Sequence, residues 1–298
     1  METRIPEAIG RSIRSPVTTM NAPRRHHYVA QMFQRRFADE KGVLFAYDKR
    51  RPERGVFGTK PGNLFVERDL NTVELKDGTV HFGLEEWYSE LEGDVSPIID
   101  KIIASAARSR LPGLTADERN TWDNFVYHQQ KRAPDAFERL GLTQQFEENV
   151  DLYIAEYERE VRPLTAEERA DLKSQGALER MKQQATVTAR GAGSEEVIAV
   201  LAQRGIAVAV MEKQNKSFIL GDYPISRMGP HSHLARTELW LPVSSKVAVS
   251  PHGNPGTELL IRPTRGDVRR VNKTIFQESN VVAACSNLLV KSLVGKRR

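Results

Sequence analysis

The stretch His26-His27-Tyr28-Val29-Ala30-Gln31-Met32-Phe33-Gln34-Arg35-Arg36-Phe37 places polar residues among side chains that are large enough to build a core. If this segment is helical, His27, Gln31 and Arg35 lie at i, i+4 and i+8 on one face, beside an aromatic face. A stripe of these residue types is either a hydrogen-bonded strut or one wall of a site for an anionic group. The stretch alone leaves both interpretations open.

Length and composition predict a globular protein with a real core, since 39% of the 298 residues are hydrophobic. No apolar run approaches the roughly 20 residues that span a bilayer, and residues 1–25 lack the apolar stretch of a secretory signal. We therefore expect a cytoplasmic protein with no membrane partner. The single cysteine, Cys285, excludes an intrachain disulfide and a cysteine-rich zinc site, and its apolar, helical context predicts an inert core residue.

The net charge of +5 is unevenly distributed along the chain. Residues 1–60 carry 13 Lys/Arg against 6 Asp/Glu, and residues 261–298 carry 9 against 2. The middle, 61–260, carries 22 against 31. If both basic ends fold onto one side, they form a positive surface that suits nucleic acid or another anionic partner. Alternatively, the basic ends dock on the acidic middle of the same chain.

The first part of the chain mixes strand and helix patterns. Residues 1–22 lack periodicity and are expected to form a mobile basic arm. Aromatic and β-branched residues predict a strand over 42–48, followed by a loop over 53–63. Alternating apolar residues on either side of Lys76-Asp77-Gly78 predict a hairpin over 73–82.

The centre of the chain has helical patterns with clear start signals. An apolar stripe predicts a helix over 84–108 that Pro97 breaks or restarts. Residues 115–118 and 165–168 both match the capping box, so a long helix is expected to begin at each. Pro134 should kink or end the first of these two helices near Arg132. Further helices are expected over 143–160 and 194–204.

The last third returns to strand patterns before a final helix. Residues 206–210 and 217–220 are predicted to pair around a polar turn. Further strands are expected over 239–242, 246–250 and 259–261, and a helical region over 266–293. Together the patterns predict an α+β fold, in which a helical central bundle packs with an antiparallel or mixed sheet built from the early and late strands. A single intertwined domain over 23–298 is expected.

Several short pieces of the sequence resemble the bacterial family catalogued as domain of unknown function 4238, over most of residues 26–287. The pieces are His26-His27-Tyr28-Val29 with Gln31 and Arg36-Phe37; Leu84-Glu85 with Glu92; His128-Gln129 with Arg132 and Pro134; Gly221-Asp222 with Pro224; Leu241-Pro242-Val243-Ser244; and Val271-Asn272. One departure is Ala30, where the family usually has proline. The resemblance implies no reaction, because that family is functionally uncharacterised.

The first candidate site joins the opening stretch to a second polar segment. His128 and Arg132 are i and i+4 in the helix expected to begin at 115, so they share a face. If that face meets His27, the arginines can clamp a phosphate and a histidine can move a proton near neutral pH. The structural alternative is that the same residues satisfy one another inside the core.

Carboxylates form a second candidate set. Glu85 and Glu92 are seven residues apart on one helix and face the same way, while Asp48 and Asp222 follow apolar strands. Three convergent carboxylates with a histidine could hold Mg²⁺ or Mn²⁺. Asp222, which precedes Tyr223-Pro224, is equally suited to accept hydrogen bonds in a turn or to pair with an arginine.

Other patterns carry less information. His231 and His233 could bind one metal ion together with His252, but they lie among Gly and Pro without further ligands, which favours exposed loop residues. The phosphate loop, the dinucleotide fingerprint, the esterase elbow and the zinc-protease motif are all missing from the sequence. We therefore expect no nucleotide cofactor.

These patterns lead us to expect an enzyme that cleaves phosphodiesters, or another phosphate-handling hydrolase, acting on nucleic acid. A histidine would be general acid and base, arginines would stabilise charge on phosphate, and carboxylates would orient the histidine or hold the metal. The predicted catalytic residues are His27, His128, Asp222 and Glu85, and the predicted phosphate- or substrate-binding residues are Gln31, Arg35, Arg36, Gln129, Arg132 and Asn272.

A rival hypothesis assigns no catalysis. In it the protein is a non-catalytic nucleic-acid-binding or regulatory protein, whose polar cluster is structural and whose surface Lys and Arg contact the partner. A role as a defence or toxin-type effector is compatible with either hypothesis.

Overall fold

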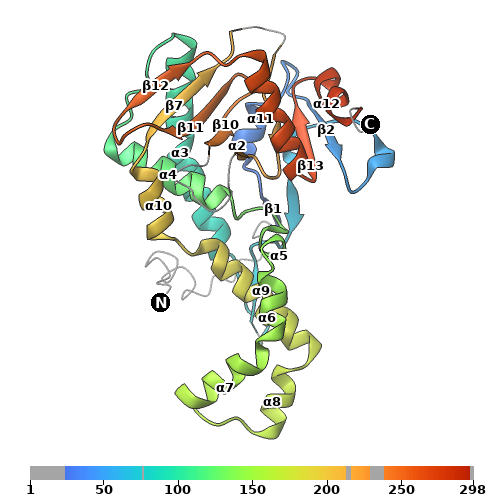
Figure 1. Ribbon diagram of the computed structural model, residues 1–298. Helices are drawn as coiled ribbons and strands as arrows, with labels where there is room; N and C mark the ends of the chain where they lie inside the picture. Colours follow the sequence, from blue (N-terminus) through green and yellow to red (C-terminus); the bar gives the residue numbers. More distant parts are fainter. Residues whose placement is uncertain (1–23, 76, 213–215, 229–237, 296–298) are drawn as a thin grey trace. The chain divides into compact units, whose positions relative to one another are not determined.

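The computed structural model describes residues 24–75, 77–212, 216–228 and 238–295 (Figure 1). These residues form two compact units, whose segments alternate along the chain. The predicted basic arm over 1–22 lies outside the described residues, and the single domain over 23–298 stays a prediction. The α+β class is confirmed, because helices and several antiparallel or mixed sheets share the chain. The first unit comprises residues 24–26, Arg68–Tyr88 and Pro134–Gly193, and the second comprises His27–Glu67, Ser89–Ala133 and residues 194–295.

The first unit contains the predicted hairpin. β5 (Val73–Glu74) and β6 (Val80–His81) pair antiparallel around Gly78, whose φ of +83° suits glycine. After the hairpin comes α3 (Gly83–Ala107), whose first turns belong to this unit. A small apolar core forms where side chains of α3, α9 and β5 meet. Its members are Leu84, Tyr88 and Val187, with Val73 and Trp87 packed against them.

The other helices of the first unit are shorter than predicted. The capping box at Thr165 is confirmed, but its helix ends at Leu172 and a new one starts after Ser174, whose side chain caps it. The helix expected over 143–160 is interrupted at Asn149. The helices are α5 (Ala136–Arg139), α6 (Leu142–Glu148), α7 (Val150–Glu160), α8 (Ala166–Leu172) and α9 (Gln175–Gly191).

Of the helices that lie wholly in the second unit, three come before its five-stranded sheet in the sequence. α2 (Gln31–Arg35) is much shorter than the stretch that suggested it. α4 (Ala116–Gln129) starts with the predicted capping box at Thr115 and ends ahead of Pro134, and α10 (Glu195–Ala202) follows later in the chain. The break predicted at Pro97 is wrong, because α3 continues through it. None of the helices in the described residues is long and apolar enough to cross a membrane.

A five-stranded sheet in the second unit has the order β12-β7-β11-β10-β9. β12 runs parallel to β7, and the other neighbours are antiparallel. The pairing predicted between 206–210 and 217–220 is wrong: β7 pairs with β11 and β12 instead. The strands are β7 (Gly205–Val210), β9 (Ser226–Met228), β10 (Glu238–Pro242), β11 (Val247–His252) and β12 (Glu258–Ile261).

A four-stranded sheet of the second unit joins the early and late strands, as predicted. Its order is β3 (Phe57–Thr59), β2 (Leu44–Asp48), β13 (Val281–Ala284) and β8 (Leu220–Gly221), all antiparallel. β3 falls within the segment expected to be a loop. The remaining short elements are β1 (Arg25–His27), which pairs with β4 (Val66–Arg68), and the 3₁₀ turns η1 (Pro52–Arg54) and η2 (Pro61–Asn63).

The helical region predicted over 266–293 is wrong in its middle, because the strand β13 divides it into α11 (Arg265–Glu278) and α12 (Asn287–Val294). All four residues of β13 are buried between β2 and β8, so pairing with distant strands outweighs the helical pattern. α11 contacts β8 and β9, and α12 contacts β13 and β2. In Figure 1 α12 lies beside the blue strand β2, although more than 200 residues separate the two in the sequence.

Candidate anion-binding site

The polar stripe of the opening stretch forms, although only part of the stretch is helical. His27 ends β1, and α2 begins at Gln31 after Ala30, which gives no side-chain cap. The Gln31 side chain accepts from Arg35 through Oε1 at 3.1 Å, so its Nε2 faces His27 Nε2 at 3.3 Å. His27, Gln31 and Arg35 therefore form one hydrogen-bonded chain.

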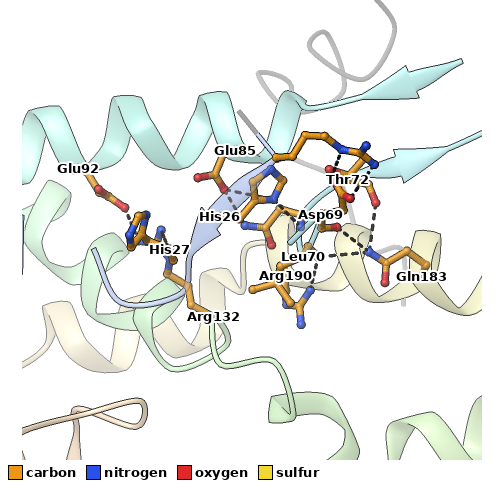
Figure 2. Close-up of polar contacts among 12 residues, drawn as sticks. His26, His27, Asp69, Leu70, Thr72, Glu85, Glu92, Arg132, Gln183 and Arg190 are labelled. Carbon is orange, nitrogen blue, oxygen red and sulfur yellow. Dashed lines mark hydrogen bonds and ion pairs between the residues drawn. The ribbon is translucent and has the colours of Figure 1, made fainter. Parts of the chain in front are cut away.

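His26, which the sequence interpretation passed over, is fully buried in the first unit. Its Nδ1 accepts from the backbone N–H of Asn71 at 2.9 Å, and the Asn71 side chain donates to Glu85 Oε2 at 2.8 Å (Figure 2). Glu85 lies 3.8 Å from the same ring nitrogen. Glu85 was predicted to be catalytic, and the histidine that lies beside it is His26. The Glu85 carboxylate accepts from Asn71 and so stabilises the turn that contains Asn71.

Side chains of α9 hold the same turn of the first unit. Gln183 Nε2 donates to the backbone oxygens of Leu70 at 3.2 Å and Thr72 at 3.1 Å (Figure 2). Arg190, a buried arginine, donates to the oxygens of Leu70 at 2.8 Å and Pro134 at 3.1 Å. All of these acceptors are backbone carbonyls, so this cluster is structural.

The end of α4 is tied to the opening stretch within the second unit. Arg132 is buried; its Nη1 lies 2.6 Å from Glu92 Oε1, and its Nη2 donates to the His27 backbone oxygen at 2.9 Å (Figure 2). Gln129 donates to the backbone oxygen of Tyr28 at 3.2 Å. The structure thus brings Arg132 and Gln129 to the segment that carries His27, as predicted, but their contacts are with backbone oxygens and one carboxylate.

His128 is buried, with its ring edge-on to that of Tyr127 at 4.9 Å. Tyr127 also contacts Lys131, whose amine lies 4.3 Å from the centre of the ring and 3.3 Å from the hydroxyl. Burial lowers the pKa of Lys131 to about 7. The sequence interpretation missed this lysine, because no periodicity distinguishes it from solvent-exposed ones.

Arg36 forms a strut between α2 and α3. Its guanidinium bonds Asp100 at 2.6 Å, and it donates to the backbone oxygens of Met32 at 2.6 Å and Ser96 at 3.3 Å. Its side chain is 14% exposed, against 67% for Asp100. Arg36, predicted to bind phosphate, thus makes these contacts with a carboxylate and backbone oxygens of the protein.

The two carboxylates that follow strands lie on either side of β13. Asp48 pairs with Val281 in the register of β2 and β13, and on the other side the backbone N–H of Asp222 donates to the Val281 backbone oxygen at 3.0 Å. The Asp222 carboxylate accepts backbone N–H groups from Tyr223, Asn280 and Val281 at 3.0–3.2 Å. Asp222 therefore acts as the turn acceptor that the sequence left open as an alternative.

Arg50 links these carboxylates electrostatically. It donates to both oxygens of Asp48, at 3.0 and 3.2 Å, and its charge also acts on Asp222 and Tyr28. Burial would raise the pKa of Asp48, but the hydrogen bonds and charge of Arg50 outweigh it and lower that pKa. Burial, assisted by the charge of Asp222, raises the pKa of the Tyr28 hydroxyl well above its usual value.

The carboxylates do not support a metal site. In the part of the chain that the structure describes, no three His, Cys, Asp or Glu side chains lie together in a way that could hold a metal ion. Glu92 is paired with Arg132, and Asp222 with backbone N–H groups. His231 and His233 lie outside the described residues. The possible Mg²⁺ or Mn²⁺ ligation stays a prediction.

A groove of about 1060 Å³ lies between α11 and α12 in the second unit, and we call it the basic groove. None of the described residues that line it is Asp or Glu. Its cationic members are Lys49, Lys216, Arg265, Arg269 and Lys273. Its other members are Ser217, Val268, Asn272, Phe276, Gln277, Cys285, Ser286, Leu288, Leu289, Ser292 and Leu293.

Most cations of the groove form no salt bridge within the described part of the chain. Arg265, Arg269 and Lys273 are exposed, and they make no salt bridge with any residue that the structure describes; the same holds for Lys216. Lys49 differs, because its amine donates to the last carbonyls of α11 at Phe276 and Gln277. Unpaired cations without a nearby carboxylate create a positive potential that attracts anions.

The second wall of the groove is largely apolar, with three leucines beside Ser286 and Ser292. Leu288 of α12 is 79% exposed, and Leu289 and Leu293 lie on the same helix. Cys285 also lines the groove; it follows β13 and is half-buried, so the helical context predicted for it is wrong. The groove therefore joins a cationic wall to an aliphatic one.

Asn272 belongs to both the fold and the groove. Its side chain donates to the backbone oxygen of Ser217 at 2.9 Å and accepts from the N–H of Ile219 at 3.1 Å. These two bonds fix α11 against the chain that leads into β8. Of the ten predicted site residues, Asn272 is the only one that lines the groove in the described part of the chain.

The sheets and the groove define an α+β protein with a cationic surface groove beside a sheet of early and late strands. A family model described as protein of unknown function (DUF4238) matches residues 25–287. The chain belongs to this family, so the resemblance seen in the sequence is confirmed. Comparisons with curated proteins and with solved structures give no match for the chain.

Proposed function

We propose that the protein binds a nucleic acid through its phosphates, in the basic groove. The observation that carries this proposal is the row of three exposed cations on α11, Arg265, Arg269 and Lys273, which form no salt bridge with any described residue, in a groove whose described lining contains no carboxylate. Phosphate contacts by Lys and Arg supply most of the affinity of proteins for nucleic acid when sequence is not read.

The uneven charge of the chain supports the same proposal. Lys49 comes from the basic N-terminal sixty residues, and Arg265, Arg269 and Lys273 come from the basic C-terminal segment. The two ends thus contribute to one surface. The alternative, in which the basic ends dock on the acidic middle, would pair these cations with carboxylates, and the three on α11 have no such pair among the described residues.

The groove supports binding better than cleavage. Neither His27 nor His128 lines it, and the bonds of Asp222 are with backbone N–H groups. A phosphodiester in the groove would therefore meet cations without a neighbouring acid and base. The sequence predicts cleavage by His27 or His128. The binding experiment described next also detects cleavage of the nucleic acid.

The test measures binding of fluorescently labelled DNA and RNA by anisotropy, with Mg²⁺, Mn²⁺ or EDTA, followed by electrophoresis of the same samples. The variant Arg269→Gln/Lys273→Gln should weaken binding about tenfold, because each surface ion pair contributes on the order of 0.5–1 kcal/mol. The oligonucleotides should remain intact.

Arg270→Gln is the matched control. Arg270 neighbours Arg269 on α11, but it pairs with Glu238 and Asp267 and does not line the groove. Its replacement should leave the affinity within about twofold of that of the unmodified protein. Equal losses in both variants, or no binding of any nucleic acid, would refute the proposal. Cleavage that His27→Ala abolishes would restore the hydrolase hypothesis.

A further inference from the structure

We infer that the basic groove takes a single nucleic-acid strand in preference to a duplex, with its phosphates along α11 and its bases against α12. This inference rests on the proposed function and adds the form of nucleic acid to it. It draws on the two walls of the groove, which differ in chemistry.

The cationic wall forms a regular row. Arg265, Arg269 and Lys273 are spaced by four residues on α11, so they share one face about 6 Å apart along the helix axis. The row is about 12 Å long. A ligand that engages the whole row carries several anionic groups in sequence, as a sugar-phosphate backbone does, whereas an amphiphile with one head group engages a single cation.

The apolar wall selects for exposed bases. Leu288, Leu289 and Leu293 offer aliphatic surface to whatever lies opposite α11, and Leu288 is 79% exposed. The bases of a duplex are stacked inside, so a duplex on α11 would leave these leucines in water. A single strand exposes the faces of its bases and can bury this surface while its phosphates contact the cations.

The composition of the groove lining also determines how much the base sequence of the bound strand matters. Phe276 is the only aromatic residue among the described lining residues; it is 9% exposed, and the Lys49 amine lies 4.6 Å from its ring centre. Aliphatic side chains contact any base face without a hydrogen-bond pattern. The bound strand is therefore selected by form, and its sequence has little effect.

The experiment compares a labelled single strand with the duplex of the same sequence, using inorganic polyphosphate and anionic phospholipid vesicles as competitors. The single strand should bind at least tenfold more tightly than the duplex. Leu288→Ala should weaken binding of the single strand about three- to tenfold, because the strand contacts this leucine. The affinity for the duplex should stay unchanged, because the duplex does not contact it. Leu259→Ala, on the exposed side of β12, should change neither.

The outcomes separate this inference from the proposed function. A duplex that binds as tightly as the strand, or a Leu288→Ala variant with unchanged affinity, would overturn the preference for a single strand and leave phosphate binding intact. Polyphosphate that competes as well as unlabelled strand, phosphate for phosphate, would also overturn it, because the bases would contribute nothing. Binding of vesicles alone would overturn both. Thermal unfolding of each variant confirms that the fold is retained.

Discussion

Lys131 carries its amine in a poorly solvated position at the end of α4. Burial lowers its pKa from the ordinary 10.5 to about 7. Between these values the unfolded chain binds a proton that the folded protein does not, so the free energy of unfolding rises with pH from about 7 to 10. Below pH 7 both states are protonated, and the cost of burying the charge is complete.

Replacing this lysine should therefore stabilise the protein most at low pH. We expect Lys131→Met to increase the free energy of unfolding at pH 6 by up to about 4 kcal/mol, with the gain shrinking as the pH approaches 10. Urea unfolding of both proteins at several pH values measures the difference. A difference that stays constant from pH 6 to 9 would contradict the lowered pKa.

The buried Arg132 decides between the two interpretations of the polar cluster. If it is a strut, Arg132→Gln leaves Glu92 and the His27 carbonyl without their donor, and the free energy of unfolding falls by about 3–5 kcal/mol. The exposed Arg159→Gln should cost less than 1 kcal/mol. A small loss for Arg132→Gln in chemical denaturation would instead mark the guanidinium as held for a ligand.

At the scale of elements, the contact of α11 with β8 depends on Gly221. A Cβ at this position would lie 2.1 Å from Ser279 Oγ and 2.8 Å from Ile275 Cγ2. Gly221→Ala should therefore destabilise the protein by about 3 kcal/mol, because α11 must move away from the sheet. Gly93→Ala is the matched control. Gly93 lies within α3, and a Cβ there would point into open space, so the alanine should increase the free energy of unfolding by about 0.5–1 kcal/mol. Thermal unfolding that ranks the two variants in the opposite order would contradict this contact.

Elements whose signals are local were predicted from the sequence, and elements fixed by distant partners were not. The capping boxes at Thr115 and Thr165 act within four residues, and both are confirmed. β13 depends on β2, more than 200 residues earlier, and its Val-Val-Ala-Ala run on its own fits the helical pattern of its neighbours. Tertiary pairing of this kind overrides local propensity.

The groove also depends on β13, which the sequence pattern does not reveal as a strand. The spacing of Arg265, Arg269 and Lys273 is visible in the sequence as one helical face. What the sequence does not show is that the chain turns through β13 and returns as α12 opposite that face. The polar stripe from His27 to Arg35 was predicted, and its contacts are present, but whether it is a strut or a site depends on neighbours that sequence spacing does not reveal.

At the scale of the whole molecule, one groove is lined by Lys49 from the basic first sixty residues and by three cations of α11 from the basic last segment, and this is the central claim about function. Each phosphate neutralised by Lys or Arg releases counterions, so the logarithm of the affinity falls with the logarithm of the salt concentration by about 0.7 per contact for a single strand. The number of cations engaged can therefore be counted from a salt series.

The most direct test is the salt dependence of single-strand binding by the unmodified protein, by Arg269→Gln/Lys273→Gln and by the control Arg270→Gln. Loss of two groove cations should make the slope shallower by about 1.4, and the control should keep the original slope. If the double variant keeps the slope of the unmodified protein, the phosphates are bound elsewhere and the basic groove is not the binding site.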